Sequence, residues 1–140
     1  VYAAQGKVYL AEELYKRFLE VMQRTLGPNH ESTLATDGNL GLLSKDLGRL
    51  DEAEDMFQRA MQGFEKILGP EDPTTLDAVT NFGNIYAARG LPMKAEEMYK
   101  RGKDGLEKAR GWHHLSTLNA ANNLRLTYTE QGRLGDVEQI

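Results

Sequence analysis

A nine-residue segment recurs in this chain at an interval of 42 residues. It reads Leu-Gly-Pro-Asn-His-Glu-Ser-Thr-Leu at residues 26–34 and Leu-Gly-Pro-Glu-Asp-Pro-Thr-Thr-Leu at residues 68–76, and a diverged copy occupies residues 110–118. Gly and Pro end helices, and Ser, Thr or Asp begin them, so each copy joins two helices. A fixed period of this size indicates an array of repeated structural units, which constrains the fold more than any other feature of the sequence.

A second series of glycines obeys the same period, and it consists of Gly6, Gly48, Gly90 and Gly132. Each ends a helical pattern, and glycine can take the left-handed conformation that closes the carboxyl end of a helix. Each repeat therefore contains a first helix, a turn at this glycine and a second helix. We predict a single domain of four units, partial at both ends, with the approximate bounds 1–27, 28–69, 70–111 and 112–140.

Hydrophobic residues at helical spacing place the helices within these units. The predicted ranges are 7–25, 32–47, 51–67, 74–89, 92–108 and 116–131, with residues 1–5 as the tail of an earlier helix and a last helix after Gly132. The predicted buried stripes of the second helices are Ala11, Leu14, Tyr15, Phe18 and Met22; Ala53, Met56, Phe57, Ala60, Met61, Phe64 and Leu68; and Ala95, Met98, Tyr99, Leu106 and Ala109. The fold class is all-α.

Two capping positions compete at the start of each first helix. One is occupied by His30, Asp72 and His114, and the other, two residues later, by Ser32, Thr74 and Ser116. Asp with Pro at the next position is a good helix start, and so is Ser or Thr. We favour the Ser/Thr position. Among the glycines within the second helices, which are Gly63, Gly102 and Gly105, Gly102 predicts close packing between helices, because Gly is otherwise unfavourable there.

Composition excludes several classes of protein. The 140 residues carry a formal net charge of −4, which argues against a nucleic-acid or anionic-membrane binder. The absence of cysteine excludes a disulfide framework, a thiolate nucleophile and a Cys-containing zinc site. A reducing compartment fits this composition, and we expect a cytoplasmic location. The chain begins at Val1 in mid-pattern, so we expect a piece of a longer protein whose ends fray or are covered by a neighbour.

No constellation for catalysis or cofactor binding is present. The sequence lacks a nucleophile elbow, a phosphate-binding loop and a dinucleotide fingerprint. His113 and His114 are adjacent, and adjacent histidines rarely bind the same ion, so we predict no metal and no cofactor. Trp112 replaces the proline of the linker; packing under the linker is the favoured interpretation, and a binding anchor is the alternative. We therefore predict that the protein is not an enzyme.

The repeat resembles the tetratricopeptide repeat. Its order of Leu-Gly, aromatic, Gly, Ala, aromatic and small residue is matched by Phe82-Gly83, Tyr86, Gly90, Ala95, Tyr99 and Gly102. The 42-residue unit with its Leu-Gly-Pro linker is similar to the kinesin light chain type, also found in fungal NOD-like receptor proteins. The resemblance implies an α-solenoid, a right-handed superhelix of antiparallel helix pairs, with about three repeats and truncated ends.

In the resembling fold the first helices line the concave surface. The residues opposite the buried stripe of these helices are therefore the candidate peptide-binding residues, with Ala88 and Thr129 beside them. They are Asn39, Leu42, Lys45 and Asp46 in one unit; Asp77, Thr80, Asn81 and Asn84 in the next; and Asn119, Asn122, Asn123, Leu126 and Glu130 in the last.

Asparagine is the prominent residue of this set. Asn39, Asn81 and Asn123 stand at one repeat position, although Asn is a poor helix former. An amide offers a donor and an acceptor, which suits a peptide backbone, and the resemblance implies such contacts. Alternatively, these three bond between neighbouring helices and hold the array together, and the sequence leaves both interpretations open. For Asn84, Asn119 and Asn122, which repeat less regularly, binding is favoured.

The leading hypothesis is a protein-interaction module that binds a peptide or partner segment in the concave groove. Amide-rich, mixed-charge walls predict modest affinity driven by the partner's backbone. A carboxylate clamp would need several basic residues in the groove, and only Lys45 is placed for it. The alternative is a structural or sensor region of a larger NOD-like signalling protein that self-associates through its uncapped ends. Neither hypothesis involves nucleic acid or a membrane.

Overall fold

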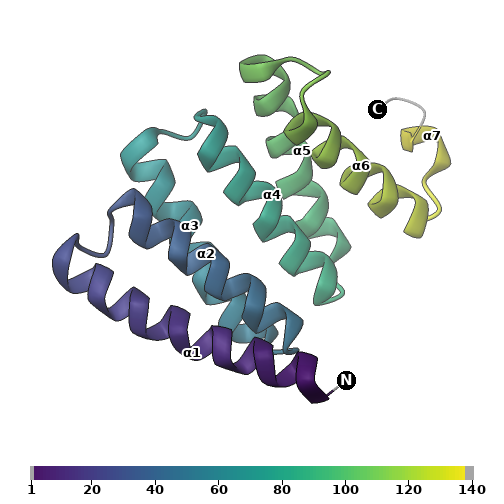
Figure 1. Cartoon of the computed structure of the whole chain (residues 1–140). Coiled ribbons are helices and arrows are strands. Elements are labelled where there is room, and N and C mark those ends of the chain that lie inside the picture. Colours follow the sequence, from purple (N-terminus) through teal and green to yellow (C-terminus); the bar gives the residue numbers. More distant parts are fainter. Residues whose placement is uncertain (1, 138–140) are drawn as a thin grey trace. The chain divides into compact units, whose positions relative to one another are not determined.

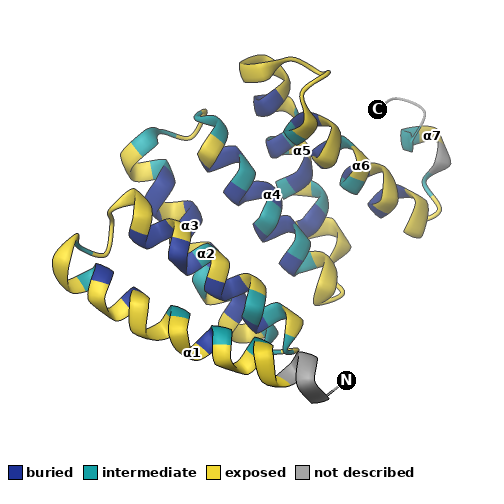
Figure 2. Cartoon of the chain, viewed as in Figure 1, coloured by how far each residue is buried: buried dark blue, intermediate teal, exposed yellow. Residues whose placement is uncertain are grey.

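The structure is a computed structural model that describes residues 2–137. These residues form seven helices and no strand (Figure 1), namely α1 (Tyr2–Thr25), α2 (Glu31–Asp46), α3 (Leu50–Leu68), α4 (Pro73–Ala88), α5 (Pro92–Arg110), α6 (Leu115–Glu130) and α7 (Leu134–Val137). The all-α prediction is confirmed. The chain divides into two compact units, Val1–Ile67 and Leu68–Ile140, and each has its own buried residues (Figure 2).

The turn glycines behave as predicted except at the first position. Gly48, Gly90 and Gly132 have φ angles of 79°, 75° and 73°, which only glycine adopts easily. Gly6, in contrast, lies inside α1, which runs unbroken from Tyr2. Packing against a preceding helix would hold a turn there, and the described residues provide no such helix. Continuing a formed helix instead adds a backbone hydrogen bond for each residue, so the helix persists through the glycine.

The first helices are capped two residues earlier than we predicted. The caps are His30, Asp72 and His114, whose side chains accept hydrogen bonds from the backbone N–H groups of Ser32, Thr74 and Ser116 at 3.1, 2.9 and 3.2 Å. Asp72 is in the extended conformation that a capping residue needs, and Pro73 already has the φ angle of a first helical residue. The same backbone geometry at the two histidines lets an imidazole nitrogen take the place of a carboxylate oxygen.

In the first unit, α2 and α3 approach closely at two glycines. The Leu34 side chain is fully buried against Gly63, where an added Cβ atom would collide with it. The Phe57 ring lies over Gly41, with its Cε2 atom 2.9 Å from the position of an added Cβ. Missing side chains on one helix therefore make room for large ones on the other, whereas the sequence had predicted such close packing only at Gly102.

The same unit buries two carboxylates. Asp37 of α2 is fully buried, and its Oδ1 atom lies 3.3 Å from Nη1 of Arg59. Glu12 of α1 is also buried, and its Oε1 atom lies 2.6 Å from Nη1 of Arg49. Burial raises the pKa of Asp37, and the charge of Arg59 opposes this effect. One oxygen of each carboxylate, Oδ2 of Asp37 and Oε2 of Glu12, has no hydrogen-bond partner. Both acids are only partly compensated for their loss of water.

The predicted apolar stripe of α1 is only partly buried. Met22 is buried, Ala11 and Tyr15 are half-buried, and Leu14 and Phe18 are exposed at 57% and 55%. The 42-residue period places Leu14 and Phe18 where Met56 and Ala60 stand on α3, the side that faces α2. Among the described residues, no helix of the first unit covers that side of α1, so the prediction is wrong for Leu14 and Phe18.

In the second unit, α5 packs against both α4 and α6. Leu76 of α4 is buried against Gly105 of α5, which repeats the contact between Leu34 and Gly63. A cluster of Ala95, Tyr99, Leu124 and Tyr128 joins α5 to α6. Ala109, predicted to be in the α5 stripe, is exposed because it lies in the last turn of that helix.

Candidate functional site

A polar pocket of about 420 Å³ lies between α4 and α6 in the second unit. Its lining residues are Asp77, Thr80, Asn81, Asn84, Ser116, Asn119, Asn122 and Asn123. All except Ser116 are residues that the sequence had singled out as candidates. We call this site the amide pocket, because five of its eight lining side chains are asparagines.

Helical spacing places these side chains on one side of each helix. On α4, Asn81 follows Asp77 by four residues and Asn84 follows Asn81 by three. On α6, Asn119 and Asn122 are also three residues apart. Residues three and four apart are neighbours on a helix surface, so each helix presents a continuous polar row to the pocket.

A tyrosine from α5 fixes the position of one of the amides. Gly83 of α4 has no side chain, and the Tyr99 ring lies over it, with Cε1 2.9 Å from the position of an added Cβ. The Tyr99 hydroxyl thereby reaches the next residue of α4 and donates a hydrogen bond of 2.6 Å to Oδ1 of Asn84. Burial, and to a lesser extent the charge of Glu130, raises the pKa of Tyr99 to about 12, so the phenol keeps its proton at neutral pH.

Asn84 also joins α4 to α6. Its Oδ1 atom accepts a second hydrogen bond, of 3.3 Å, from Nδ2 of Asn123. This is the contact that the scaffold interpretation predicts for Asn123. On the same helix, Asn122 accepts a hydrogen bond of 2.8 Å from Arg125 through its Oδ1.

These bonds determine which polar groups remain available in the pocket. With their oxygens engaged, Asn84 and Asn122 keep Nδ2 as a donor, whereas Asn123 keeps Oδ1 as an acceptor. No described side chain forms a hydrogen bond with the amides of Asn81 or Asn119, so both retain a donor and an acceptor. The pocket thus offers donors and acceptors side by side on two helices.

Asp77 contributes the negative charge of the pocket. It is half-buried, and this burial raises the pKa of its carboxyl group. The charge of Arg110, a hydrogen bond from Ser116 and the charge of His114 act in the opposite direction without cancelling the effect. Asp77 is therefore a carboxylate that its own chain only partly compensates.

The remaining candidates lie outside the amide pocket or form its floor. Thr80 is 7% exposed, and its hydroxyl donates to the Leu76 carbonyl oxygen at 3.1 Å, so it shapes the pocket rather than offering a free group. Leu126 and Glu130 are exposed on α6 and do not line the pocket. The candidates of the first unit all lie on α2, where Asn39, Leu42 and Asp46 are exposed and Lys45 is half-buried.

Two contributors were not among the candidates. Ser116 lines the pocket, and its position in the first turn of α6 explains why it was assigned to capping alone. Tyr99 was assigned to the buried stripe, and it is buried, but a buried tyrosine hydroxyl needs a partner. That requirement was the available signal for its bond to Asn84.

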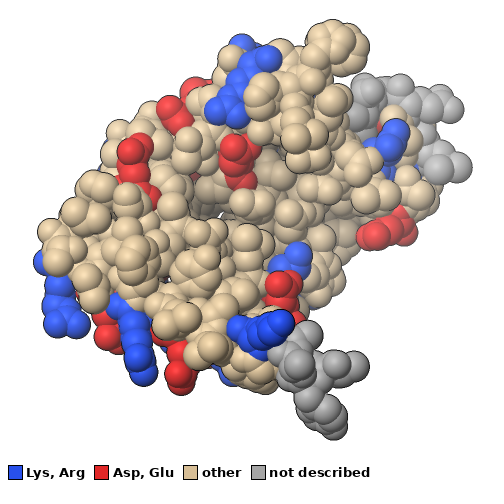
Figure 3. Space-filling model, in the orientation of Figure 1, with Lys and Arg blue, Asp and Glu red and all other residues tan. Residues whose placement is uncertain are grey.

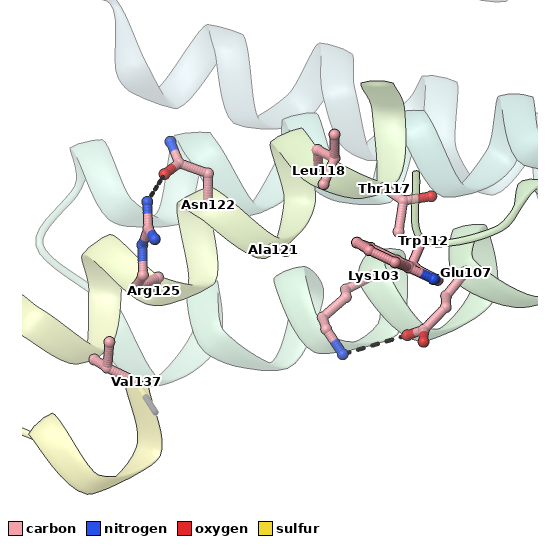
Figure 4. Close-up of a pocket in the computed structure, with 9 residues that line it drawn as sticks. All are labelled: Lys103, Glu107, Trp112, Thr117, Leu118, Ala121, Asn122, Arg125 and Val137. Carbon is pink, nitrogen blue, oxygen red and sulfur yellow. Dashed lines mark hydrogen bonds and ion pairs between the residues drawn. The ribbon is translucent and has the colours of Figure 1, made fainter. Parts of the chain in front are cut away.

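A second, larger hollow of about 630 Å³ lies on α5 and α6 (Figure 4). Leu118 lines it and is 46% exposed, although the equivalent residues Leu34 and Leu76 are fully buried against Gly63 and Gly105. In the equivalent position of the other two repeats, a second helix, α3 or α5, packs against this leucine. The hollow therefore corresponds to a helix-packing surface. We therefore do not assign it to a ligand, although it exceeds the amide pocket in volume.

Trp112 forms one wall of this hollow and does not pack under the linker. Its side chain is 60% exposed and stacks on His113, with 3.5 Å between the ring centroids. In Figure 4 the indole lies beside Lys103 and Glu107, which form an ion pair with 3.4 Å between Nζ and Oε2. The favoured sequence interpretation of Trp112 is thus wrong, because the first residues after Gly111 turn away from the core.

Charged groups are dispersed over the surface. On the face shown in Figure 3, acidic and basic side chains are interspersed, and most of the surface is uncharged. Within residues 2–137 no cluster of three or more His, Asp or Glu could hold a metal ion. No helix in this range is long and apolar enough to cross a membrane.

Comparison with known proteins places the chain in a family. The model of the family described as "Tetratricopeptide repeat" matches residues 1–66 and, overlapping them, 32–108. The fold is similar to that of BtubC (BKLC) from P. vanneervenii, with a TM-score of 0.83, 19% sequence identity and coverage of 99% of this chain and 55% of that one. No curated protein matches the sequence.

A second structural relative is a putative kinesin light chain of Podosopora anserina with nearly identical TPR-like repeats. Its TM-score is 0.86 and its sequence identity 24%, with coverage of 97% of this chain and 64% of that one. The chain therefore spans between about half and two thirds of the length of these structures. The TM-scores establish a shared fold, and at identities this low the similarity extends no further than the fold.

Proposed function

The chain belongs to the tetratricopeptide repeat family and has the fold of its kinesin light chain type, and on this premise we propose that it binds an extended peptide segment of a partner protein in the amide pocket. Repeats of this family generally mediate protein–protein interaction. We place the protein in the cytoplasm and assign it no catalytic activity as parts of the same proposal.

The observation that supports the proposal is the set of unengaged amides on α4 and α6. Every peptide unit other than proline carries one donor and one acceptor, and Asn81 and Asn119 offer the complementary pair. Asn84, held by Tyr99, presents a donor in a fixed direction. Contacts of this kind recognise a backbone rather than particular side chains, which predicts modest affinity and broad sequence tolerance.

A selection from a displayed library of short unstructured peptides tests the proposal, followed by affinity measurements on the enriched peptides. Asn81→Ala and Asn119→Ala should each weaken binding about threefold to tenfold, the equivalent of one neutral hydrogen bond. Tyr99→Phe should weaken it as well, because Asn84 loses its support. Asn29→Ala, in an exposed linker of the first unit, is the matched control and should have no effect. If all four variants bound the peptides with the affinity of the unmodified chain, the assignment of binding to the amide pocket would be refuted.

The second candidate is a structural or sensor role within a larger signalling protein of the NOD-like kind, with self-association. It is favoured by an exposed apolar side of α1 that carries Leu10, Leu14, Phe18 and Val21, each at least 51% exposed. Apolar patches of this kind often contact another protein surface. Light scattering over a range of concentrations separates the candidates: growth in mass that Leu14→Gln and Phe18→Gln abolish supports self-association, and a constant monomer mass excludes it.

A further inference from the structure

Asp77 is the only ionisable side chain that lines the amide pocket among the described residues; the other seven lining residues are neutral. It lies at the end of the pocket formed by the first turn of α6, where Ser116 is near enough to lower its pKa. A ligand seated on the asparagines would therefore meet a single charge, and that charge is negative. The pocket is asymmetric, with a charged end and a neutral remainder.

From this asymmetry we infer that the peptide bound in the amide pocket carries a lysine or arginine side chain that pairs with Asp77. The inference rests on the proposed function, because it concerns the same pocket. It adds the chemical class of the ligand: an extended segment with one cation at a fixed position, rather than an acidic or neutral one.

The surroundings of Asp77 support this assignment. A half-buried carboxylate loses part of its hydration, and a cation at close range recovers the lost interaction. Arg110 and His114 oppose the effect of burial on Asp77 without cancelling it, and neither lines the pocket. Arg125 donates to Asn122 and lines the neighbouring hollow, and none of the described Lys or Arg side chains lines the pocket itself.

A structural role for Asp77 accounts for only part of its bonding capacity. A carboxylate near the amino end of α6 interacts favourably with that helix, and the nearby Ser116 hydroxyl acts in the same direction. An ionised carboxylate has about four acceptor positions, so a single neighbouring hydroxyl leaves most of them for a ligand. An acidic peptide, in contrast, would place like charges together with no cation in the lining to separate them.

The library selection described above, repeated on three forms of the 140-residue chain, tests the inference. These are the unmodified chain, Asp77→Asn, and Asp55→Asn as a control that makes the same change in net charge at an exposed position of α3. We expect the unmodified chain and the control to enrich Lys or Arg at one position about fivefold, a ratio in the range of partly exposed ion pairs. Asp77→Asn should retain peptide binding and lose this enrichment.

The outcomes separate the inference from the proposed function. Enrichment of neutral or acidic peptides whose binding still depends on Asn81 and Asn119 would overturn the inference alone, as would a cation preference that survives in Asp77→Asn. Peptides that bind equally well to Asn81→Ala and Asn119→Ala bind elsewhere, and that result would overturn both. Synthetic copies of the enriched peptides, with their Lys or Arg replaced by norleucine, should bind the unmodified chain about fivefold more weakly and Asp77→Asn unchanged.

Discussion

The helix pairs α2–α3 and α4–α5 have the same backbone plan but differ in what they bury. Both place a leucine of the first helix against a glycine of the second, Leu34 on Gly63 and Leu76 on Gly105. Three residues after this leucine, however, α2 carries a buried Asp37 where α4 carries a buried Val79. The fold therefore requires a fixed shape at the glycines and tolerates a change of chemistry elsewhere. The polar contents of each pair are specific to that pair.

Val79→Asp, which gives the second pair the residue of the first, should have the largest effect on stability. It places a carboxylate at a fully buried position, so we expect a loss of about 3–5 kcal/mol in the free energy of unfolding, the typical penalty for an uncompensated buried charge. Calorimetry and hydrogen exchange of α4 and α5 would measure it. A loss no greater than that of Val79→Ala would show that both pairs accept an acid equally.

Adding a methyl group at the shared glycines tests the common part of the comparison. Gly63→Ala and Gly105→Ala should each lower stability by about 1–3 kcal/mol, because the new Cβ collides with a fully buried leucine. Gly38→Ala is the control: nothing lies within 4 Å of its added Cβ, so Ala should raise stability by about 0.5–1 kcal/mol. The same sign for all three in thermal denaturation would contradict the shape requirement.

Asp37→Val, the reverse exchange, should stabilise the first pair by about 1 kcal/mol at neutral pH, since it removes a partly compensated carboxylate. The raised pKa of Asp37 means that the folded chain binds this proton more tightly than the unfolded chain does. The stabilisation that the protonated Asp37 side chain contributes is therefore complete below pH 3.8, the ordinary pKa of Asp. It is lost as the pH rises through the higher pKa of Asp37 in the folded chain.

Hydrogen exchange of α2 and α3 as a function of pH would isolate the contribution of Asp37 to stability. The difference in stability between Asp37→Val and the unmodified chain should grow as pH rises through that window. Asp37→Asn, which keeps the shape and removes the charge, should also lack the pH dependence of stability that Asp37 causes. A difference that does not change with pH would contradict the assignment of the raised pKa to this residue.

The capping residues provide the smallest expected effect. His30→Asp and His114→Asp give α2 and α6 the cap that α4 already has, and an anionic cap also favours the amino end of a helix. We expect each to raise stability by about 0.5 kcal/mol. The reverse exchange, Asp72→His, should lower it by a similar amount. Thermal denaturation of the three single variants would show whether the two kinds of cap are equivalent.

The 42-residue period predicted the helix pairs and the turns at Gly48, Gly90 and Gly132, because these follow from local spacing. Seven of the eight pocket residues were candidates for another reason: the resemblance implies that the first helices line a concave surface. The capping position was missed because two good caps stand two residues apart, and only the backbone conformation of His30, Asp72 and His114 shows which of them begins the helix. The side of α1 that is buried depends on which neighbouring helix is present, and periodicity does not reveal this. The contact of Tyr99 with Asn84 requires the close approach of helices at Gly83, a three-dimensional fact.

Trp112, the single tryptophan of the chain, stands at the joint between α5 and α6, stacked on His113. Its intrinsic fluorescence therefore reports events in the second unit, whereas the first unit is spectroscopically silent above the absorption range of tyrosine. An unfolding transition followed by tryptophan emission alone would register one half of the molecule. Placing a second indole at Tyr9, which is 49% exposed on α1, would give the other half a signal of its own.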